Sequence, residues 1–261
     1  VQTCALPIYP GTINEKVALN GLSLKSNEGD FVTVIGGNGA GKSTMLNAVA
    51  GVWPVDEGQI IIDGTDVTKL SEYKRAAYLG RVFQDPMTGT AATMGIEENL
   101  ALAKRRGKTR FLRSGITKAE REEYKELLKI LNLGLEDRLT SKVGLLSGGQ
   151  RQALTLLMAT LQKPKLLLLD EHTAALDPKT AAKVLDITDR IVNRDHLTTL
   201  MITHNMKDAI AHGNRLIMMM NGKIILDIQG EEKKKLTVKQ LLDKFEEASG
   251  EEFSNDSAIL G

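Results

Sequence analysis

Residues 30–44 read DFVTVIGGNGAGKST, and this stretch decides the fold. Its first six residues are mostly β-branched and apolar, which predicts a short buried strand over 30–35. Glycines follow the strand, and residues 45–50 have helical character. The loop matches G-x-x-x-x-G-K-[ST] between a strand and a helix, which is the context in which that pattern binds a phosphate. The sequence therefore predicts a nucleotide-phosphate site at this loop.

The residue types of this loop suit an anion. Glycines allow backbone angles that other L-residues avoid, so several N–H groups can converge on one phosphate, and the following helix adds its positive end. Lys42 is expected to reach the β- and γ-phosphates, and Ser43 is expected to ligate Mg²⁺. A turn that matches by chance is the alternative. The expected nucleotide-binding residues are Gly36, Gly37, Asn38, Gly39, Ala40, Gly41, Lys42, Ser43 and Thr44.

A second apolar run, LLLLDE at 166–171, ends in two carboxylates. Four apolar residues predict a buried strand, and ligands of open α/β sheets bind where such strands end. Asp170 is expected to support Mg²⁺, and Glu171 to polarise the attacking water as a general base. An acidic strand end is a weak signal by itself, but the phosphate loop makes the catalytic interpretation the stronger one.

Apolar strands alternate with helices along the chain, which predicts an α/β fold with a largely parallel sheet. Residues 89–163 are more helical and are expected to form an insertion. Further strands are expected at 58–63, 81–84, 165–170 and 198–203, a hairpin at 215–220 and 223–227, and helices at 118–131, 150–161, 180–193 and 236–247.

LSGGQ at 146–150 precedes the long apolar helix expected in this insertion. A serine near the helix cap and two glycines expose backbone N–H groups, so this helix end can bind a second phosphate. The alternative is a simple cap before a core helix, since Leu154, Leu157, Met158 and Leu161 share one face. A phosphate loop, then LSGGQ, then LLLLDE resembles the signature of ATP-binding-cassette (ABC) ATPases.

The resemblance implies a P-loop NTPase core of the RecA type, with antiparallel β and α-helical subdomains. It implies ATP and Mg²⁺ as cofactors and a head-to-tail homodimer, or a pair of ATPase subunits. Two ATP molecules are held in such a dimer, and the signature of one subunit contacts the γ-phosphate held by the other. The signature residues that carry over are Ser147, Gly148, Gly149 and Gln150.

Three more residues follow the family's order. Gln84 resembles the Q-loop glutamine, a Mg²⁺ and water ligand, and Asp177 stands in a segment that resembles the D-loop of the dimer interface. His204 resembles the H-loop histidine that contacts the γ-phosphate. The other histidines, His172, His196 and His212, match no such role and are expected in loops or at the surface. His172 stands where many family members carry proline.

The N-terminal residues carry two expectations. Family members stack the adenine on an aromatic residue before the phosphate loop, and Tyr9 is the candidate here. Residues 1–8, VQTCALPI, can be back-translated into a common sequencing-library adapter, so they are expected to be non-native. The alternative is an ordinary N-terminal strand. The expected domains are then the segment 1–8, an ABC ATPase domain over 9–230 with a helical subdomain at about 89–163, and a helical tail over 231–261.

The composition excludes several classes of protein. With 34 Lys and Arg against 33 Asp and Glu, the net charge of +1 gives no sign of a nucleic-acid partner. The basic stretch 104–113 is interpreted as a solvated loop, with anionic lipid or nucleic acid as the alternative. One cysteine, Cys4, excludes a disulfide scaffold. The apolar runs are too short to span a membrane, which takes roughly 20 residues.

The resemblance covers about residues 11–230 and implies a subunit that hydrolyses ATP to energise a membrane transporter. In detail, GTINEKVALNGLSL, GRVFQDPMTGTA, KVGLLSGGQRQALTLLMAT and DEHTAALDPKT resemble importer ATPases for tryptophan/tyrosine or other small organic solutes. The expected partners are transmembrane permease subunits and a substrate-binding protein, and the expected place is the cytoplasmic face of the membrane. The alternative is a soluble ABC ATPase in repair, translation or cluster assembly, and a phosphate-loop kinase or GTPase is disfavoured by LSGGQ.

Overall fold

The computed structural model describes residues 2–8, 16–106 and 115–249, and its centre is a six-stranded sheet. The strand order is β11-β10-β3-β9-β8-β7, and every neighbouring pair is parallel except β10 and β11. The expected α/β fold of the P-loop type is therefore confirmed. The strands are β3 (Phe31–Ile35), β7 (Leu79–Val82), β8 (Leu166–Asp170), β9 (Thr199–Ile202), β10 (Arg215–Met220) and β11 (Lys223–Gln229).

A smaller antiparallel sheet pairs β2 (Lys16–Leu22), β1 (Gln2–Ile8) and β4 (Glu57–Gln59), and β5 (Ile61–Ile62) pairs with β6 (Thr65–Asp66). The strand expected at 58–63 is thus two strands that break at Ile60. The break has a cause, because the Ile60 N–H donates to the Thr68 side chain at 2.8 Å and its carbonyl accepts from the Val67 N–H.

The N-terminal residues that carry the adapter-like sequence take part in this sheet, since Gln2–Ile8 forms β1 between β2 and β4. A strand here matches the alternative that the sequence left open. The non-native origin of residues 1–8 stays a prediction, which resequencing of the genomic locus tests. Tyr9 lies outside the described residues.

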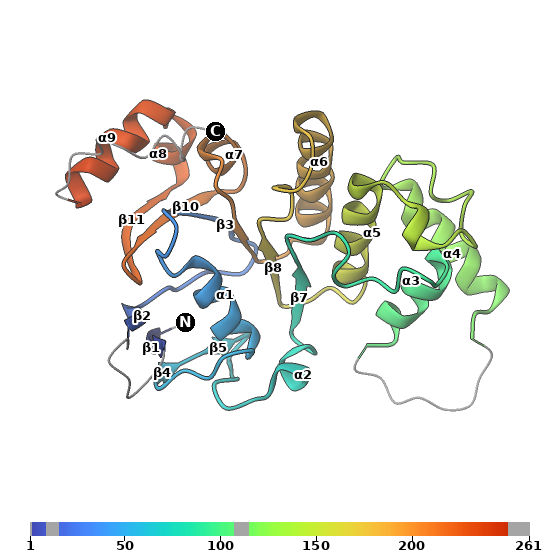
Figure 1. Cartoon of the computed structure of the whole chain (residues 1–261), viewed down its shortest axis with the longest axis horizontal. Helices are drawn as coiled ribbons and strands as arrows, with labels where there is room; N and C mark the ends of the chain where they lie inside the picture. Colours follow the sequence, from blue (N-terminus) through green and yellow to red (C-terminus); the bar gives the residue numbers. More distant parts are fainter. Residues whose placement is uncertain (1, 9–15, 107–114, 250–261) are drawn as a thin grey trace.

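Helices surround the central sheet (Figure 1), and those of the expected insertion, α3, α4 and α5, lie together beyond β7. They bury apolar side chains such as Tyr124, Leu128 and Leu154 in a cluster that also includes Val82 of β7 and Leu169 of β8, so this region shares its core with one face of the sheet. The helices are α1 (Lys42–Ala50), α2 (Glu72–Arg75), α3 (Ile96–Lys104), α4 (Lys118–Lys129), a 3-10 turn (Val143–Leu145), α5 (Gly148–Thr160), α6 (Pro178–Asp195), α7 (Met206–Ala211), α8 (Gly230–Lys234) and α9 (Val238–Ser249).

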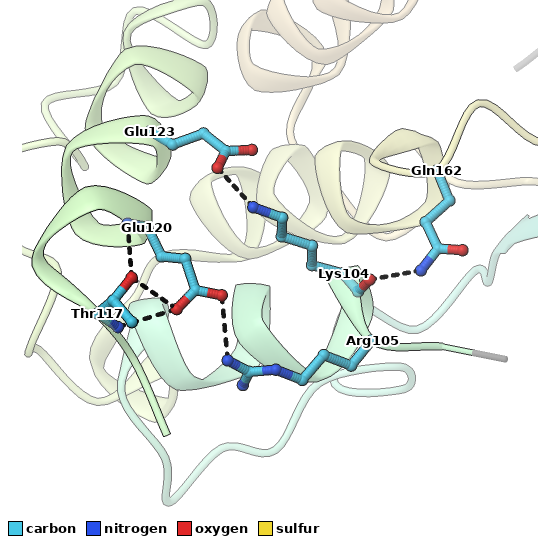
Figure 2. A network of polar contacts seen from close by, with 6 residues as sticks. All are labelled: Lys104, Arg105, Thr117, Glu120, Glu123 and Gln162. Atoms are coloured by element: carbon cyan, nitrogen blue, oxygen red, sulfur yellow. Dashed lines mark hydrogen bonds and ion pairs between the residues drawn. The ribbon is translucent and has the colours of Figure 1, made fainter. Parts of the chain in front are cut away.

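The basic stretch begins at the end of α3, where carboxylates of α4 neutralise its first two cations (Figure 2). Lys104 lies 2.5 Å from Glu123, and Arg105 lies 3.1 Å from Glu120. These pairs join α3 to α4 within the helical region. Residues 107–113 of the stretch lie outside the described residues.

The C-terminal helices pack on the edge of the sheet. Leu236, Leu241 and Phe245 are buried with side chains of β10 and α7. Lys233 of α8 is also buried, and its ammonium donates to the carbonyls of His212 and Gly213. Burial lowers the pKa of Lys233 to about 8. This cation therefore ties the C-terminal helices to the segment after α7.

The register of the parallel strands aligns their carboxyl ends. Ile202 of β9 pairs with Val34 of β3 on one side and with Asp170 of β8 on the other, and Val82 of β7 pairs with Leu169. The loops that follow these four strands carry the phosphate loop, His204, Glu171 and Gln84. Residues that are far apart in the sequence are thus brought to one edge of the sheet.

Candidate active site

The phosphate loop folds tightly between β3 and α1, with Gly36, Gly39 and Gly41 at positive φ angles. A Cβ on Gly36 would lie 2.2 Å from the Met219 carbonyl oxygen, so this position accepts no side chain. Gly41 caps α1 in the left-handed region, and no side chain caps that helix end. The first N–H groups of α1 are therefore available to an anion.

Lys42 occupies the centre of this loop. Its ammonium donates to the carbonyls of Gly36 at 2.6 Å and Gly37 at 3.1 Å, and the residue is buried. Burial lowers the pKa of Lys42, whereas the carboxylates of Glu171 and Asp170 act in the opposite direction. The sequence prediction that Lys42 and these carboxylates share a site is consistent with this arrangement.

Glu171 follows β8 in a strained backbone conformation, with φ of 48°, which is rare for a residue with a side chain. Its N–H donates to the Ile202 carbonyl at 3.1 Å. Its carboxylate lies 2.5 Å from the His204 Nε2, and Glu171 is the more buried of the two. The imidazole and the carboxylate are thus in direct contact.

Asp170 faces a cation that the sequence analysis did not single out. Arg81 of β7 lies 3.6 Å from Asp170, and its guanidinium donates to the Asn47 side chain at 2.7 Å. The signal was present in the sequence, because Arg81 stands in the strand that leads to Gln84. A single arginine in a strand does not, however, indicate a carboxylate partner.

The residues expected to hold Mg²⁺ are Ser43, Gln84 and Asp170. All three offer oxygen atoms, which is the donor type that Mg²⁺ prefers, and the Ser43 and Gln84 side chains are exposed. Within the described residues no group of three His, Cys, Asp or Glu side chains is placed to hold a metal. That donor set fits an ion bound by one carboxylate together with phosphate oxygens and water.

The signature segment starts α5 and caps itself. The Ser147 hydroxyl accepts from the Gln150 N–H at 3.3 Å, and the Gln150 side chain accepts from the Ser147 N–H at 3.1 Å. Ser147 and Gly148 are exposed, whereas Leu154 and Leu157 of the same helix are buried. The functional and structural interpretations of LSGGQ therefore apply to different faces of α5.

The start of α5 touches the start of α6. A Cβ on Gly149 would lie 2.2 Å from the Thr180 Cγ2, so the glycine is required for this close approach. Asp177 caps α6, because its carboxylate accepts from the Thr180 N–H at 3.1 Å. Hydrogen bonding to the Thr180 side chain, and then to the Thr180 N–H, lowers the pKa of Asp177. The signature and the D-loop-like segment are thus adjacent within one chain.

The loop after β7 is joined to α5 by a contact that the sequence analysis missed. Gln152 is buried, and its amide donates to the Phe83 carbonyl at 2.9 Å, one residue before Gln84. Gln84 itself is exposed. A glutamine on the apolar face of an expected helix was the available signal.

The three histidines expected in loops or at the surface all lie in loops, and they differ in exposure. His196 is exposed at the end of α6. His212 lies 2.7 Å from Asp189 and is mostly covered. His172 lies in the loop after β8 but is not at the surface, because the residue is 1% exposed and its Nε2 lies 3.1 Å from the Thr188 hydroxyl. Burial, with a smaller contribution from His212, lowers the pKa of His172 to about 4.

A phosphate loop, a strand-end carboxylate pair and a histidine at one sheet edge, with LSGGQ at a second helix end, define an ABC ATPase. A family model described as ABC transporter matches residues 19–174. The chain belongs to this family, whose general activity is ATP hydrolysis.

Several curated relatives are import or transport subunits. The tyrosine transport ATP-binding protein of Clostridioides difficile (strain R20291) is 48% identical over 239 residues, which cover 92% of this chain and 93% of the relative. The methionine import ATP-binding protein MetN of Rhizobium etli is 37% identical over 80% of the chain and 56% of its own length. The spermidine/putrescine import ATP-binding protein PotA of Haemophilus ducreyi is 35% identical over 82% of the chain and 54% of its own length.

Solved structures show the same fold. A dimeric post-hydrolysis state of the ATP-binding cassette MJ0796 bound to ADP and Pi superimposes with a TM-score of 0.73 at 29% identity. The superposition covers 87% of this chain and 97% of the MJ0796 chain. The chain is therefore similar to the ATP-binding subunits of importer-type systems over most of its length. None of the relatives named above is a repair, translation or cluster-assembly protein.

Proposed function

We propose that this chain hydrolyses ATP to energise the uptake of tyrosine or a related small amino acid. The observation that carries the proposal is the similarity to the tyrosine transport ATP-binding protein, which extends over nearly the full length of both chains. The methionine and polyamine import relatives support the importer class, but they are 37% and 35% identical to the chain, against 48% for the tyrosine relative.

We propose that Lys42 and the N–H groups of the phosphate loop bind the phosphates of ATP, with Ser43, Gln84 and Asp170 as the residues that hold Mg²⁺. When bound, Mg²⁺ neutralises part of the phosphate charge. Glu171 accepts a proton from the attacking water, and His204 orients that carboxylate and contacts the γ-phosphate. The 2.5 Å contact between the Glu171 carboxylate and the His204 Nε2 supports these roles, because it joins the two side chains that are proposed to act together.

We propose that two copies assemble head to tail, so that Ser147, Gly148, Gly149, Gln150 and Asp177 of one copy complete the site of the other. The exposed signature end of α5 supports this assembly, since it carries N–H groups and a hydroxyl that the chain leaves at its surface. The dimeric state of MJ0796 is a precedent at 29% identity.

The partner in the membrane is proposed to be a permease that binds beside α3. A cleft of about 410 Å³ lies between the core and the helical region, and Ala76, Phe83, Leu102 and Met158 are among its lining residues. Phe83 precedes Gln84 and is held by α5, so a segment bound in this cleft contacts the loop that leads to the proposed Mg²⁺ ligand. Apolar lining suits a packed helical segment.

Bound to this permease, the chain is proposed to lie at the cytoplasmic face of the membrane. A substrate-binding protein is proposed as a further partner. Among the helices that the structure describes, none has the length and apolar character needed to cross a bilayer.

The substitution Glu171→Gln tests the proposed catalysis. The carboxamide keeps the size of the side chain but cannot accept the water proton, so turnover is expected to fall about 10²–10⁴-fold. ATP binding is expected to persist, because Lys42 and the loop are unchanged, and the dimer is expected to accumulate with ATP. The measurements are steady-state phosphate release and size-exclusion chromatography with ATP. Wild-type turnover in this variant would remove Glu171 from the role of base.

The solute is tested separately, by searching the neighbouring genes for a permease and a binding protein and co-purifying their products with the chain. Calorimetry on that binding protein with tyrosine, tryptophan, methionine and spermidine then distinguishes the solute classes. Tyrosine binding supports the proposal, and selective binding of spermidine would overturn its amino-acid part.

A further inference from the structure

His172 is the residue after Glu171, yet it lies in the core rather than at the active-site surface. Its side chain is buried between the loop after β8 and helix α6, where its Nε2 lies 3.1 Å from the Thr188 hydroxyl. The hydrolysis chemistry proposed above makes no use of this imidazole. A buried polar ring beside the proposed base therefore needs its own explanation.

The direction of this hydrogen bond can be derived. A threonine hydroxyl has one proton, and that of Thr188 is donated to the Val184 carbonyl at 2.9 Å, one turn earlier in α6. The Thr188 oxygen must then accept from His172. Burial keeps the ring neutral, so this hydrogen bond assigns the tautomer that carries its proton on Nε2.

The backbone conformation at Glu171 explains why the loop after β8 needs an additional contact such as the His172 hydrogen bond. Its φ of 48° is a strained conformation, and such conformations persist only where surrounding contacts enforce them. The Glu171 N–H donates to the Ile202 carbonyl, and the Glu171 carbonyl accepts from the Ala174 N–H at 2.9 Å. These two backbone bonds fix the loop to β9 and to itself. The His172 bond is a side-chain tie from this loop to α6.

Helix α6 is a suitable anchor, because it also contacts the other parts of the site. Its first turn holds Asp177 and packs Thr180 against Gly149 of the signature helix. The residue after Thr188, Asp189, lies 2.7 Å from His212 at the end of α7. A loop fastened to α6 is thereby placed relative to the signature helix as well as to the strands.

We infer that His172 is a positioning residue, which holds the Glu171 carboxylate in its hydrolytic position through the hydrogen bond to Thr188. The inference rests on the proposed role of Glu171. It concerns the chemical step alone, because the hydrogen bond of His172 goes to Thr188 of α6 and not to Lys42 or the phosphate loop, which are proposed to bind ATP.

The test uses the purified full chain and measures kcat and KM for MgATP in two series. In the first series, His172→Leu removes the donor while keeping a similar volume, and His172→Gln keeps an N–H at a similar reach. In the second, Thr188→Val removes the acceptor and Thr188→Ser keeps it. Thr160→Val is the matched control, since the buried Thr160 hydroxyl also donates to the carbonyl four residues earlier, Leu156, and its other hydrogen bond goes to the Leu157 carbonyl of the same helix.

His172→Leu and Thr188→Val are each expected to lower kcat about tenfold, with KM for ATP within about twofold of wild type, because misplacement of a catalytic group slows chemistry rather than binding. The double variant is expected to be no slower than either single one. Gln at 172 and Ser at 188 are expected to recover most of the rate, and Thr160→Val to keep it.

The inference is overturned if His172→Leu keeps the wild-type kcat, or if Thr160→Val loses as much rate as Thr188→Val. Thermal unfolding of each variant identifies any that fails to fold, and in that case the Ser and Val variants at 188 decide. Glu171→Gln separates the two proposals. If that variant is inactive while His172→Leu is fully active, only the positioning role fails, and if it is active, the role of Glu171 fails.

Discussion

The N-termini of α1 and α5 both carry glycines, but they differ in how they are capped and in what surrounds them. At α1, Gly41 supplies no side-chain cap, and the buried Lys42 and the strand-end carboxylates surround the loop within the same chain. At α5, Ser147 and Gln150 cap each other, and the outer face stays exposed. The first end is the proposed phosphate site and is built within one chain. The second is an exposed surface and is the end proposed to contact a ligand held by another copy.

The largest effect is expected when the two helix ends are damaged in separate chains. Lys42→Ala removes the loop cation, and Ser147→Arg places a bulky side chain at the exposed helix end, so each variant alone is expected to lose nearly all turnover. Mixed in equal amounts, they are expected to recover up to about a quarter of the wild-type rate, because half of the dimers then hold one intact site of two. Phosphate release from the mixture is the measurement, with each variant alone as the control. No recovery would favour sites completed within one chain.

The contact between α5 and α6 gives a smaller effect. Gly149→Ala inserts a methyl group 2.2 Å from the Thr180 Cγ2, so the free energy of unfolding is expected to fall by about 1–3 kcal/mol. Thr180→Ser removes that methyl group, and the double variant is expected to regain most of the loss. Urea unfolding of the two single variants and the double variant measures this. A double variant as unstable as Gly149→Ala would show that another contact sets the approach of the two helices.

The smallest effect concerns pH. The pKa of His172 is about 4 in the folded chain against 6.5 without burial, so between these values the unfolded chain binds a proton that the folded one does not. Stability is therefore retained above pH 6.5 and lost as the pH falls toward 4. Between pH 6.5 and 4.5, wild type is expected to lose about 2 kcal/mol more than His172→Leu. Urea unfolding at both pH values checks this, and parallel losses would mean that His172 protonates freely when folded.

Much of the fold, and of the site at the carboxyl ends of the parallel strands, was predictable from the sequence. Apolar strands such as 166–170 and the glycine-rich loop depend on local residue types, and parallel topology then brings Lys42 and Glu171 to one edge. Contacts between elements were not predictable, because the local sequence around a residue does not reveal its partner in another element. The three contacts missed for this reason are Arg81 with Asp170, Gln152 with Phe83 and His172 with Thr188. The break at Ile60 was missed for the same reason, since its partner is a side chain eight residues away.

Lys233 has a practical consequence for anyone who engineers this chain. A stop codon or a fusion joint placed before α8 would take away the donor to the carbonyls of His212 and Gly213 and uncover the apolar side chains beneath α9. Because α7 begins two residues after His204, such damage would lie close to the nucleotide end of the sheet. An affinity tag or a fluorescent reporter is therefore best placed beyond Ser249, where it leaves α8 and α9 and their packing on the sheet intact.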